Sequence, residues 1–306
     1  MLLDNDGTHY SFVPSISMGL GYTSSLISVG VGYNATIGGH TQKFNGKTEP
    51  KTVNKSAHTP VLVLNAMDNA FRMAIPIQVY VDNDKLENGG YDNKMAVSVD
   101  SQFRYYTGLD ALPQVRLFLR YGLYQNESKA SKDAEKVKTK YGESFGFDFR
   151  LYFGSMVEEV ALQPLVRLAY DGALGNYHAN ARIQAVKAMN GDYDAMSYGG
   201  GVWNLTLMTG LGLTANSDIV SLYLEPQLGL AVASRAPIVA TAPGTPAQAR
   251  VTTESYSLTY NVYAEIYITP LKNLEWYFEA QLGSGANQNS LVFNGTTGIT
   301  WYLPAL

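Results

Sequence analysis

The last strand-like stretch of the chain is the feature that most constrains its fold. Residues 290–303 read SLVFNGTTGITWYL, and apolar side chains recur at nearly every second position. A period of two is that of a β-strand, whose successive side chains point to opposite faces. The stretch therefore predicts a strand with an apolar and a polar face. One parity carries Leu291, Phe293, Thr297, Ile299, Trp301 and Leu303, and the other carries Asn294, Thr296, Gly298, Thr300 and Tyr302.

The same alternation recurs upstream about a dozen times, which extends the prediction to nearly the whole chain. One example is residues 71–81, where Arg72, Gln78 and Tyr80 lie on the polar parity. Short turn-like segments alternate with long polar segments between the strands. Pro76, Pro164 and Pro226 fall inside predicted strands, where a missing N–H predicts bulges. Long loops are predicted at residues 38–58, 82–93, 125–142, 172–195 and 235–253.

Composition narrows the class of protein further. Charged residues make up 16% of the chain, against roughly 25% in soluble domains. The chain has 22 tyrosines, whose apolar ring and polar hydroxyl suit a membrane interface or a wall that faces water. It has no cysteine, which excludes disulfides and thiolate metal sites. A net charge of -4 argues against nucleic acid as a partner.

Two kinds of membrane or export segment are not predicted. No apolar run reaches the ~18 residues of a transmembrane helix. No basic segment followed by an apolar one opens the sequence, so we expect no signal peptide and interpret the chain as a mature or trimmed form.

The spacing of Thr296, Gly298, Trp301 and Leu303 resembles the C-terminal assembly signal of bacterial outer-membrane β-barrels. Pro304, Ala305 and Leu306 follow it here, whereas such barrels commonly stop at or just after the aromatic residue. The resemblance implies an all-β, transmembrane, up-and-down antiparallel β-barrel in the cell outer membrane. It also implies recognition of the last strand by the barrel-assembly machinery. Lipid offers no hydrogen-bond partner, which is why a sheet that crosses it closes on itself.

We predict a single barrel domain over residues 8–303, with about twelve strands and fourteen as the next choice. Counting residues 61–67 as a strand gives an odd total, so that either one strand is missing at the front or the first hairpin is differently arranged. A trimmed C-terminal barrel domain, as in spirochaete major outer sheath proteins, is similar in this respect. A soluble β-sandwich also alternates, but its strands are shorter and its outer face is richer in charge. Residues 178–188 are compatible with a strand or with a short helix in a loop.

Charged residues on the polar parity define the predicted lumen. Strands up to residue 171 contribute arginines, and later strands contribute glutamates without arginine. Because strand order is angular order in an up-and-down barrel, this predicts a cationic wall opposite an acidic one. The alternative is a lumen filled by side chains that form salt bridges. The predicted pore-lining residues are Arg72, Arg104, Arg116, Arg120, Arg150, Arg167, Asp100, Asp148, Glu159, Glu225, Glu265, Glu275 and Glu279.

Three functions are compatible with this fold. The first is a porin-like channel for passive diffusion of small hydrophilic solutes or ions. The second is a plugged or structural barrel that acts as a surface adhesin or receptor through its loops. The third is an outer-membrane lipid-modifying enzyme, which is disfavoured because the four histidines show no metal-ligand or triad spacing. We therefore expect no catalysis, cofactor or metal, and we leave a homo-oligomer open.

Overall fold

The computed structural model describes residues 14–42, 51–86, 88–155, 161–174, 203–235, 253–271, 273–284 and 291–301. These residues contain no helix that could cross a membrane. They form thirteen strands, which are β1 (Ser15–Thr23), β2 (Ile27–Gln42), β3 (Lys51–Ala66), β4 (Phe71–Lys85), β5 (Tyr91–Tyr106), β6 (Gln114–Lys129), β7 (Val137–Tyr152), β8 (Ala161–Ala173), β9 (Trp203–Asn216), β10 (Val220–Arg235), β11 (Thr253–Leu271), β12 (Leu274–Ser284) and β13 (Leu291–Trp301).

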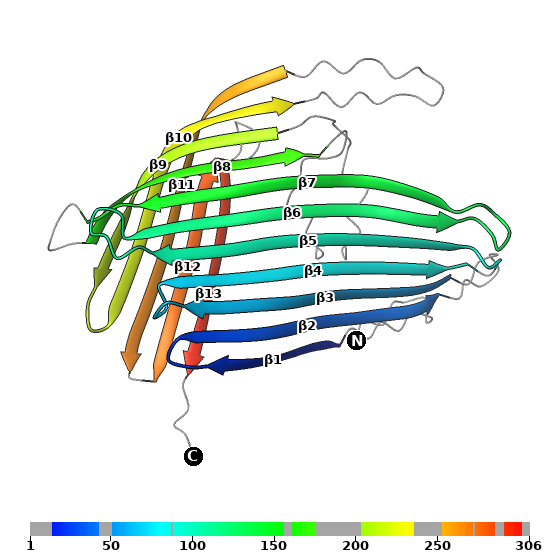
Figure 1. The fold of residues 1–306 in the computed structure, drawn as a ribbon, viewed down its shortest axis with the longest axis horizontal. Helices are drawn as coiled ribbons and strands as arrows, with labels where there is room; N and C mark the ends of the chain where they lie inside the picture. The colour runs from blue at the N-terminus through cyan, green and yellow to red at the C-terminus, as the bar shows by residue number, and fades with distance from the viewer. Residues whose placement is uncertain are drawn as a thin grey trace.

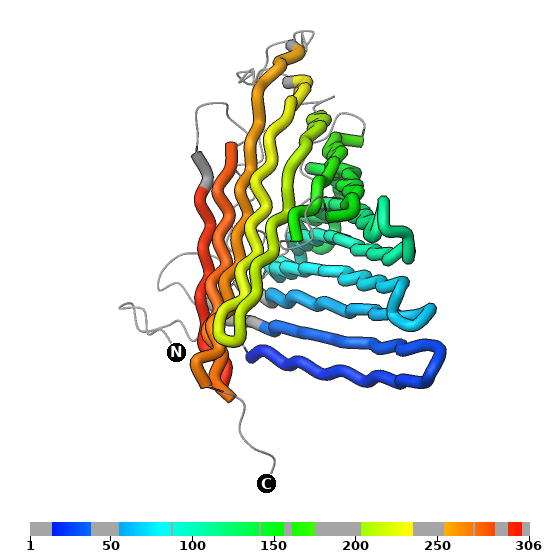
Figure 2. Tube along the Cα trace, turned by 90° about the vertical axis from the view of Figure 1, so that its left-hand side faces the viewer, coloured from blue at the N-terminus to red at the C-terminus, as the bar shows by residue number. Residues whose placement is uncertain are grey.

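The strands form one sheet in chain order, and each pairs antiparallel with the next. The sheet curls strongly, so that β11–β13 lie behind β1–β7 (Figure 1) and the two groups face each other as separate walls (Figure 2). The predicted up-and-down antiparallel order is confirmed. Among the described residues, β1 and β13 do not pair with each other, so closure of the sheet stays a prediction.

The described residues contain thirteen strands, against the predicted total of about twelve, and the additional strand structure lies near the front of the chain. Most of the predicted loop 38–58 is strand, since β2 runs to Gln42 and β3 begins at Lys51. Because every neighbouring pair is antiparallel and the described strands number thirteen, β1 and β13 run in the same direction. The odd total obtained from the sequence thus agrees with the described sheet.

Two further predicted loops, 82–93 and 125–142, are also shorter than expected. β4 continues to Lys85 and β5 begins at Tyr91, both inside the predicted loop 82–93. β6 continues to Lys129 and β7 begins at Val137, both inside the predicted loop 125–142. These strand ends are polar, so hydrophobic periodicity could not reveal them. Loop 172–195, including residues 178–188, and loop 235–253 lie mostly outside the described residues.

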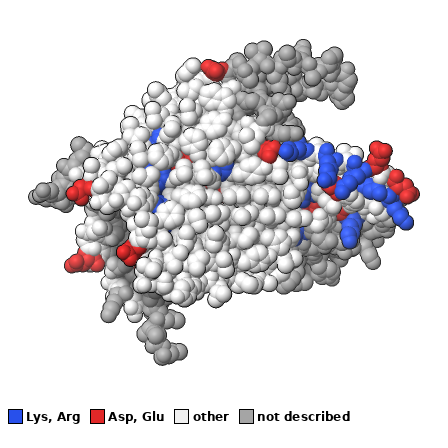
Figure 3. Space-filling model, in the orientation of Figure 1, with Lys and Arg blue, Asp and Glu red and all other residues white. Residues whose placement is uncertain are grey.

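The convex face of the sheet is apolar from strand to strand. Its side chains are half-exposed or exposed, with exposed fractions of 52% for Leu207 and 62% for Leu230. Figure 3 shows that the outer surface over β1–β7 is almost free of charge, while lysines and acidic residues gather at the tips of the β4–β5 and β6–β7 hairpins. Such a belt fits contact with hydrocarbon. One register row across β5–β11 reads Phe103, Leu117, Phe149, Leu168, Leu207, Leu230 and Leu258.

The concave face carries the opposite parity and the buried polar groups. The Arg150 guanidinium on β7 lies 3.9 Å from the Glu225 carboxylate on β10, although β8 and β9 lie between them. A side-chain contact that skips two strands is possible only on the inside of the curve. Asp148 is fully buried on this face, and Arg120 is 5% exposed.

The prolines do not introduce the predicted bulges. The β4–β5 register is the same before and after Pro76, and the β9–β10 register is the same across Pro226. Register shifts occur instead at Tyr124/Gln125 and between Ile268 and Leu271. Pro76 pairs with Val61 on β3, and Pro226 pairs with Val262 on β11. Each proline therefore has a register partner on one of its two neighbouring strands.

Candidate functional site

A row of five arginines crosses the concave face from β4 to β8. Each stands directly opposite the next in the register of the sheet. Directly opposed residues have Cβ atoms roughly 4.5–5.5 Å apart, and like charges at that separation destabilise a sheet unless they find partners. The row therefore needs compensating groups, and its two halves obtain them differently. The members in order are Arg72, Arg104, Arg116, Arg150 and Arg167.

The half on β7 and β8 is paired with one buried carboxylate. Asp148 Oδ2 lies 3.0 Å from Arg150 Nη2 and 2.8 Å from Arg167 Nη2. Arg120 Nη2 lies 3.8 Å from the same oxygen, and Arg120 Nε lies 3.4 Å from Asp100 Oδ1. This network of arginines and aspartates matches the alternative of internal salt bridges predicted from the sequence.

The half on β4, β5 and β6 has no carboxylate within ion-pair distance among the described residues. Arg72 donates from Nε to the Asn69 carbonyl at 3.2 Å and lies 5.3 Å from the centre of the Tyr106 ring. Arg104 donates from Nη1 to the Tyr106 hydroxyl at 3.4 Å. Arg116 donates from Nε to Gln114 Oε1 at 2.9 Å. Its guanidinium also lies 4.6 Å from the centre of the Tyr152 ring. These partners are uncharged, so the positive charge is not cancelled.

A second row borders the arginines towards the short turns. Tyr106, Gln114 and Tyr152 are register partners on β5, β6 and β7. Sequence analysis missed this row. The alternation of side chains could have predicted this row. Each member lies two positions from an arginine in the sequence and therefore on the same face of the sheet.

The acidic wall lies on β10, β11 and β12. Glu225 is 3% exposed and accepts hydrogen bonds from Tyr223 and Gln227. Glu265 and Glu279 are register partners, and both accept from the Tyr263 hydroxyl. Glu275 stands on the same parity of β12. The structure thus brings the predicted cationic and acidic residues to one face, and the Arg150–Glu225 contact joins them. Glu159 lies outside the described residues.

The predicted assembly signal divides between the two faces of β13. Thr296 and Gly298 are partners of Glu279 and Tyr277, on the concave side. Trp301 lies on the opposite parity and is 72% exposed. A Cβ at Gly298 would lie 2.5 Å from the Tyr277 ring, so the absence of a side chain at Gly298 makes room for this ring. Leu303 lies outside the described residues, and recognition by the assembly machinery stays a prediction.

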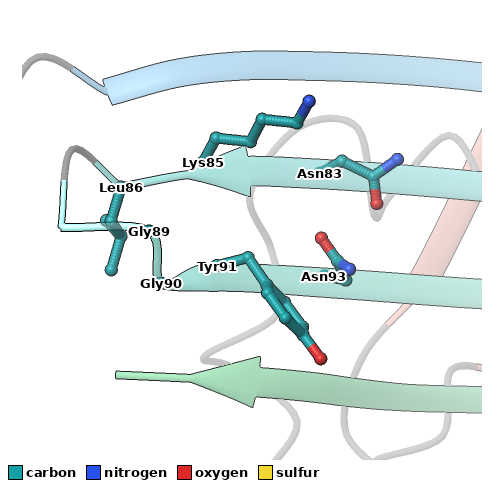
Figure 4. Close-up of a pocket in the computed structure, with 7 residues that line it drawn as sticks. All are labelled: Asn83, Lys85, Leu86, Gly89, Gly90, Tyr91 and Asn93. Carbon is teal, nitrogen blue, oxygen red and sulfur yellow. The ribbon is translucent and has the colours of Figure 1, made fainter. Parts of the chain in front are cut away.

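The β4–β5 and β6–β7 hairpins dock on each other at the opposite end of the strands. Asn88 Nδ2 donates to the Ala130 carbonyl at 2.9 Å, and the Lys132 N–H donates to the Asn88 carbonyl at 3.1 Å. A Cβ at Gly90 would lie 2.5 Å from the Lys129 carbonyl, so glycine permits this approach. A shallow hollow at the β4–β5 tip lies between Lys85 and Tyr91 (Figure 4).

Ion pairs order the Lys-rich β6–β7 hairpin. Glu127 accepts from Lys136 at 2.7 Å and lies 3.4 Å from Lys138. The hydrogen bond from Lys136 holds the pKa of the Glu127 carboxyl below its usual range. No group of three or more histidine, aspartate or glutamate residues within the described ranges is placed to hold a metal ion. His58, the described histidine on β3, hydrogen-bonds through Nδ1 with the Tyr33 hydroxyl at 2.6 Å.

The model of the Serpulina hyodysenteriae variable surface protein family matches residues 5–302. The chain belongs to this family. The family, the apolar convex belt and the up-and-down sheet place the protein in the cell outer membrane as a β-barrel surface protein, as the sequence predicted. A comparison with curated protein sequences gave no match.

Two solved structures align with most of this chain at low sequence identity. The open form of the ferric-catecholate import receptor Fiu from E. coli aligns over 95% of this chain and 57% of its own, with 10% identity and a TM-score of 0.46. The NalP autotransporter translocator domain from Neisseria meningitidis aligns over 92% of this chain and 90% of its own, with 15% identity and a TM-score of 0.36. The chain thus spans a little over half the length of Fiu.

Proposed function

We propose that this surface protein is a porin-like channel for passive diffusion of small hydrophilic solutes or ions, with no catalytic step. The supporting observation is the arginine row on the concave face, of which Arg72, Arg104 and Arg116 have no carboxylate partner among the described residues. Arg72 is exposed, and Arg104 and Arg116 are half-buried. A purely structural lumen would gain stability by pairing such charges, whereas a wet lumen keeps them solvated.

Single-channel conductance in a planar bilayer tests the proposal. We expect discrete conductance steps and a reversal potential in a KCl gradient that indicates a preference for chloride. Removal of two lumen charges in Arg104→Gln/Arg116→Gln should shift that reversal potential towards potassium, because fixed charges set the local ion concentration.

The matched control removes two positive charges outside the concave row, in Lys136→Gln/Lys138→Gln. It should leave the reversal potential unchanged. Refolded, heat-modifiable protein without conductance steps would contradict the channel, and equal selectivity in all three proteins would contradict the role of the arginines.

A second candidate function is binding of a partner at the cell surface through the docked hairpins. It is favoured by the inter-hairpin bonds of Asn88 and by the lysines that surround the β6–β7 tip. The lysines of this ordered surface can contact polyanions, and Asp133 and Glu135 stand among them. Charged hairpins are also a common way to keep a surface hydrated, so binding needs a direct test.

Replacing residues 130–136 by an Asn-Gly turn should abolish retention of the protein on immobilised heparin, a polyanionic probe. The same variant should keep the conductance of the unmodified protein, because the turn lies at the end of the strands away from the arginine row. Unchanged retention would contradict hairpin binding.

A further inference from the structure

We propose that Arg72, Arg104 and Arg116 form a binding site for oxyanions of the phosphate class on the concave face. The inference rests on the proposed channel in that it names the solutes that the lumen selects. Arg150 and Arg167 of the row are paired with Asp148. The other three arginines of the row have no partner among the described carboxylates.

The register brings the Cα atoms of the three arginines close enough for their long side chains to reach one small anion. Neighbouring strands lie roughly 4.8 Å apart, so three register partners on β4, β5 and β6 span about 10 Å. Arg72 and Arg104 converge on one residue, because the first lies over the Tyr106 ring and the second donates to its hydroxyl. Two forked donors brought together in this way match an oxyanion, which accepts several parallel N–H bonds.

The bordering row holds the arginines in place. Gln114 is 8% exposed and accepts from Arg116 Nε, which fixes one edge of that guanidinium. The Tyr152 ring stacks under the same group at 4.6 Å and is 2% exposed. Such packing reduces the conformational entropy that these side chains lose when a ligand binds.

Charge repulsion supplies the driving force. Directly opposed like charges destabilise the sheet, and an anion shared by Arg72, Arg104 and Arg116 would remove that repulsion. None of the described carboxylates lies within ion-pair distance of Arg72, Arg104 or Arg116, although Glu225 accepts a hydrogen bond at 3.5 Å from the hydroxyl of Tyr152, the ring that lies against Arg116. Asp100 and Asp148 contact Arg120, and Glu225 is held by Tyr223 and Gln227.

Binding of inorganic phosphate to the detergent-refolded full chain, measured by calorimetry at constant ionic strength, tests the site without requiring conduction. We expect Arg104→Gln/Arg116→Gln to weaken phosphate binding by about tenfold or more, as is typical for loss of charge-assisted hydrogen bonds. Arg116→Lys keeps the charge but loses the fork, and it should give an intermediate value. Lys55→Gln removes a positive charge that is already paired, 3.4 Å from the Asp82 carboxylate, and it should bind as the unmodified protein does.

The bilayer supplies the second readout. Phosphate added at constant chloride should reduce the chloride current of the unmodified channel and should not reduce that of Arg104→Gln/Arg116→Gln. Equal phosphate affinity in the unmodified and double-variant proteins would overturn the site even if the channel conducts. Absence of conduction with intact, arginine-dependent phosphate binding would instead overturn only the channel.

Discussion

Replacing Asp148 by asparagine is expected to destabilise the protein by about 3–5 kcal/mol, the usual effect of removing one partner from a buried charge network. Asp148 is fully buried and contacts Arg120, Arg150 and Arg167. Asparagine keeps the shape of the side chain but removes the negative charge that these three guanidinium groups share. The free energy of unfolding in urea, followed by tryptophan fluorescence in lipid vesicles, measures the change.

The matched control is Asp133→Asn, the same chemical change on the exposed β6–β7 turn. It should alter the free energy of unfolding by less than about 0.5 kcal/mol. If Asp148→Asn and Asp133→Asn proved equally stable, the arginine cluster would not depend on Asp148.

The second large effect is expected for Gly229→Ala on β10. A Cβ at this position would lie 2.0 Å from the Leu207 carbonyl oxygen and 2.6 Å from the Met208 Cα, both on β9. These are backbone atoms of the paired strand, so no rotamer change relieves the clash. We expect a loss of about 1–3 kcal/mol or more, as for other overpacked sites. The fraction of protein that refolds to the heat-modifiable form on SDS gels reports it.

Gly32→Ala on β2 provides the comparison, because a Cβ there would meet only ordinary contacts at 3.8 Å and 3.9 Å. That variant should refold like the unmodified protein. Normal refolding of Gly229→Ala would show that β9 and β10 can separate without loss of the barrel.

The arrangement of the lumen explains why both readings of its charges from the sequence hold in part. Arg120, Arg150 and Arg167 form the salt-bridge network expected of a filled interior. Arg72 and Arg104, closer to the edge of the row, have only neutral partners among the described residues. One face thus combines a salt-bridged cluster with arginines that contact only neutral groups among the described residues.

The strand ends show where sequence patterns stop being informative. Alternation identified the membrane-facing segments because one face of each is apolar. It ended before Lys85 and Lys129, where the hydrogen-bonded ladder continues in water with polar side chains on both faces. The predicted loops were too long for this reason.

The side of the sheet that carries the arginines of the row follows from the sequence alone. A period of two is a local property, so Arg104 and Arg116 could be assigned to the polar parity from their neighbours alone. The opposition of these two arginines and the contact between Arg150 and Glu225 become visible only in the folded sheet. Register and curvature arise from pairing between segments far apart in the chain, and a slip of two residues would keep every face while breaking the row.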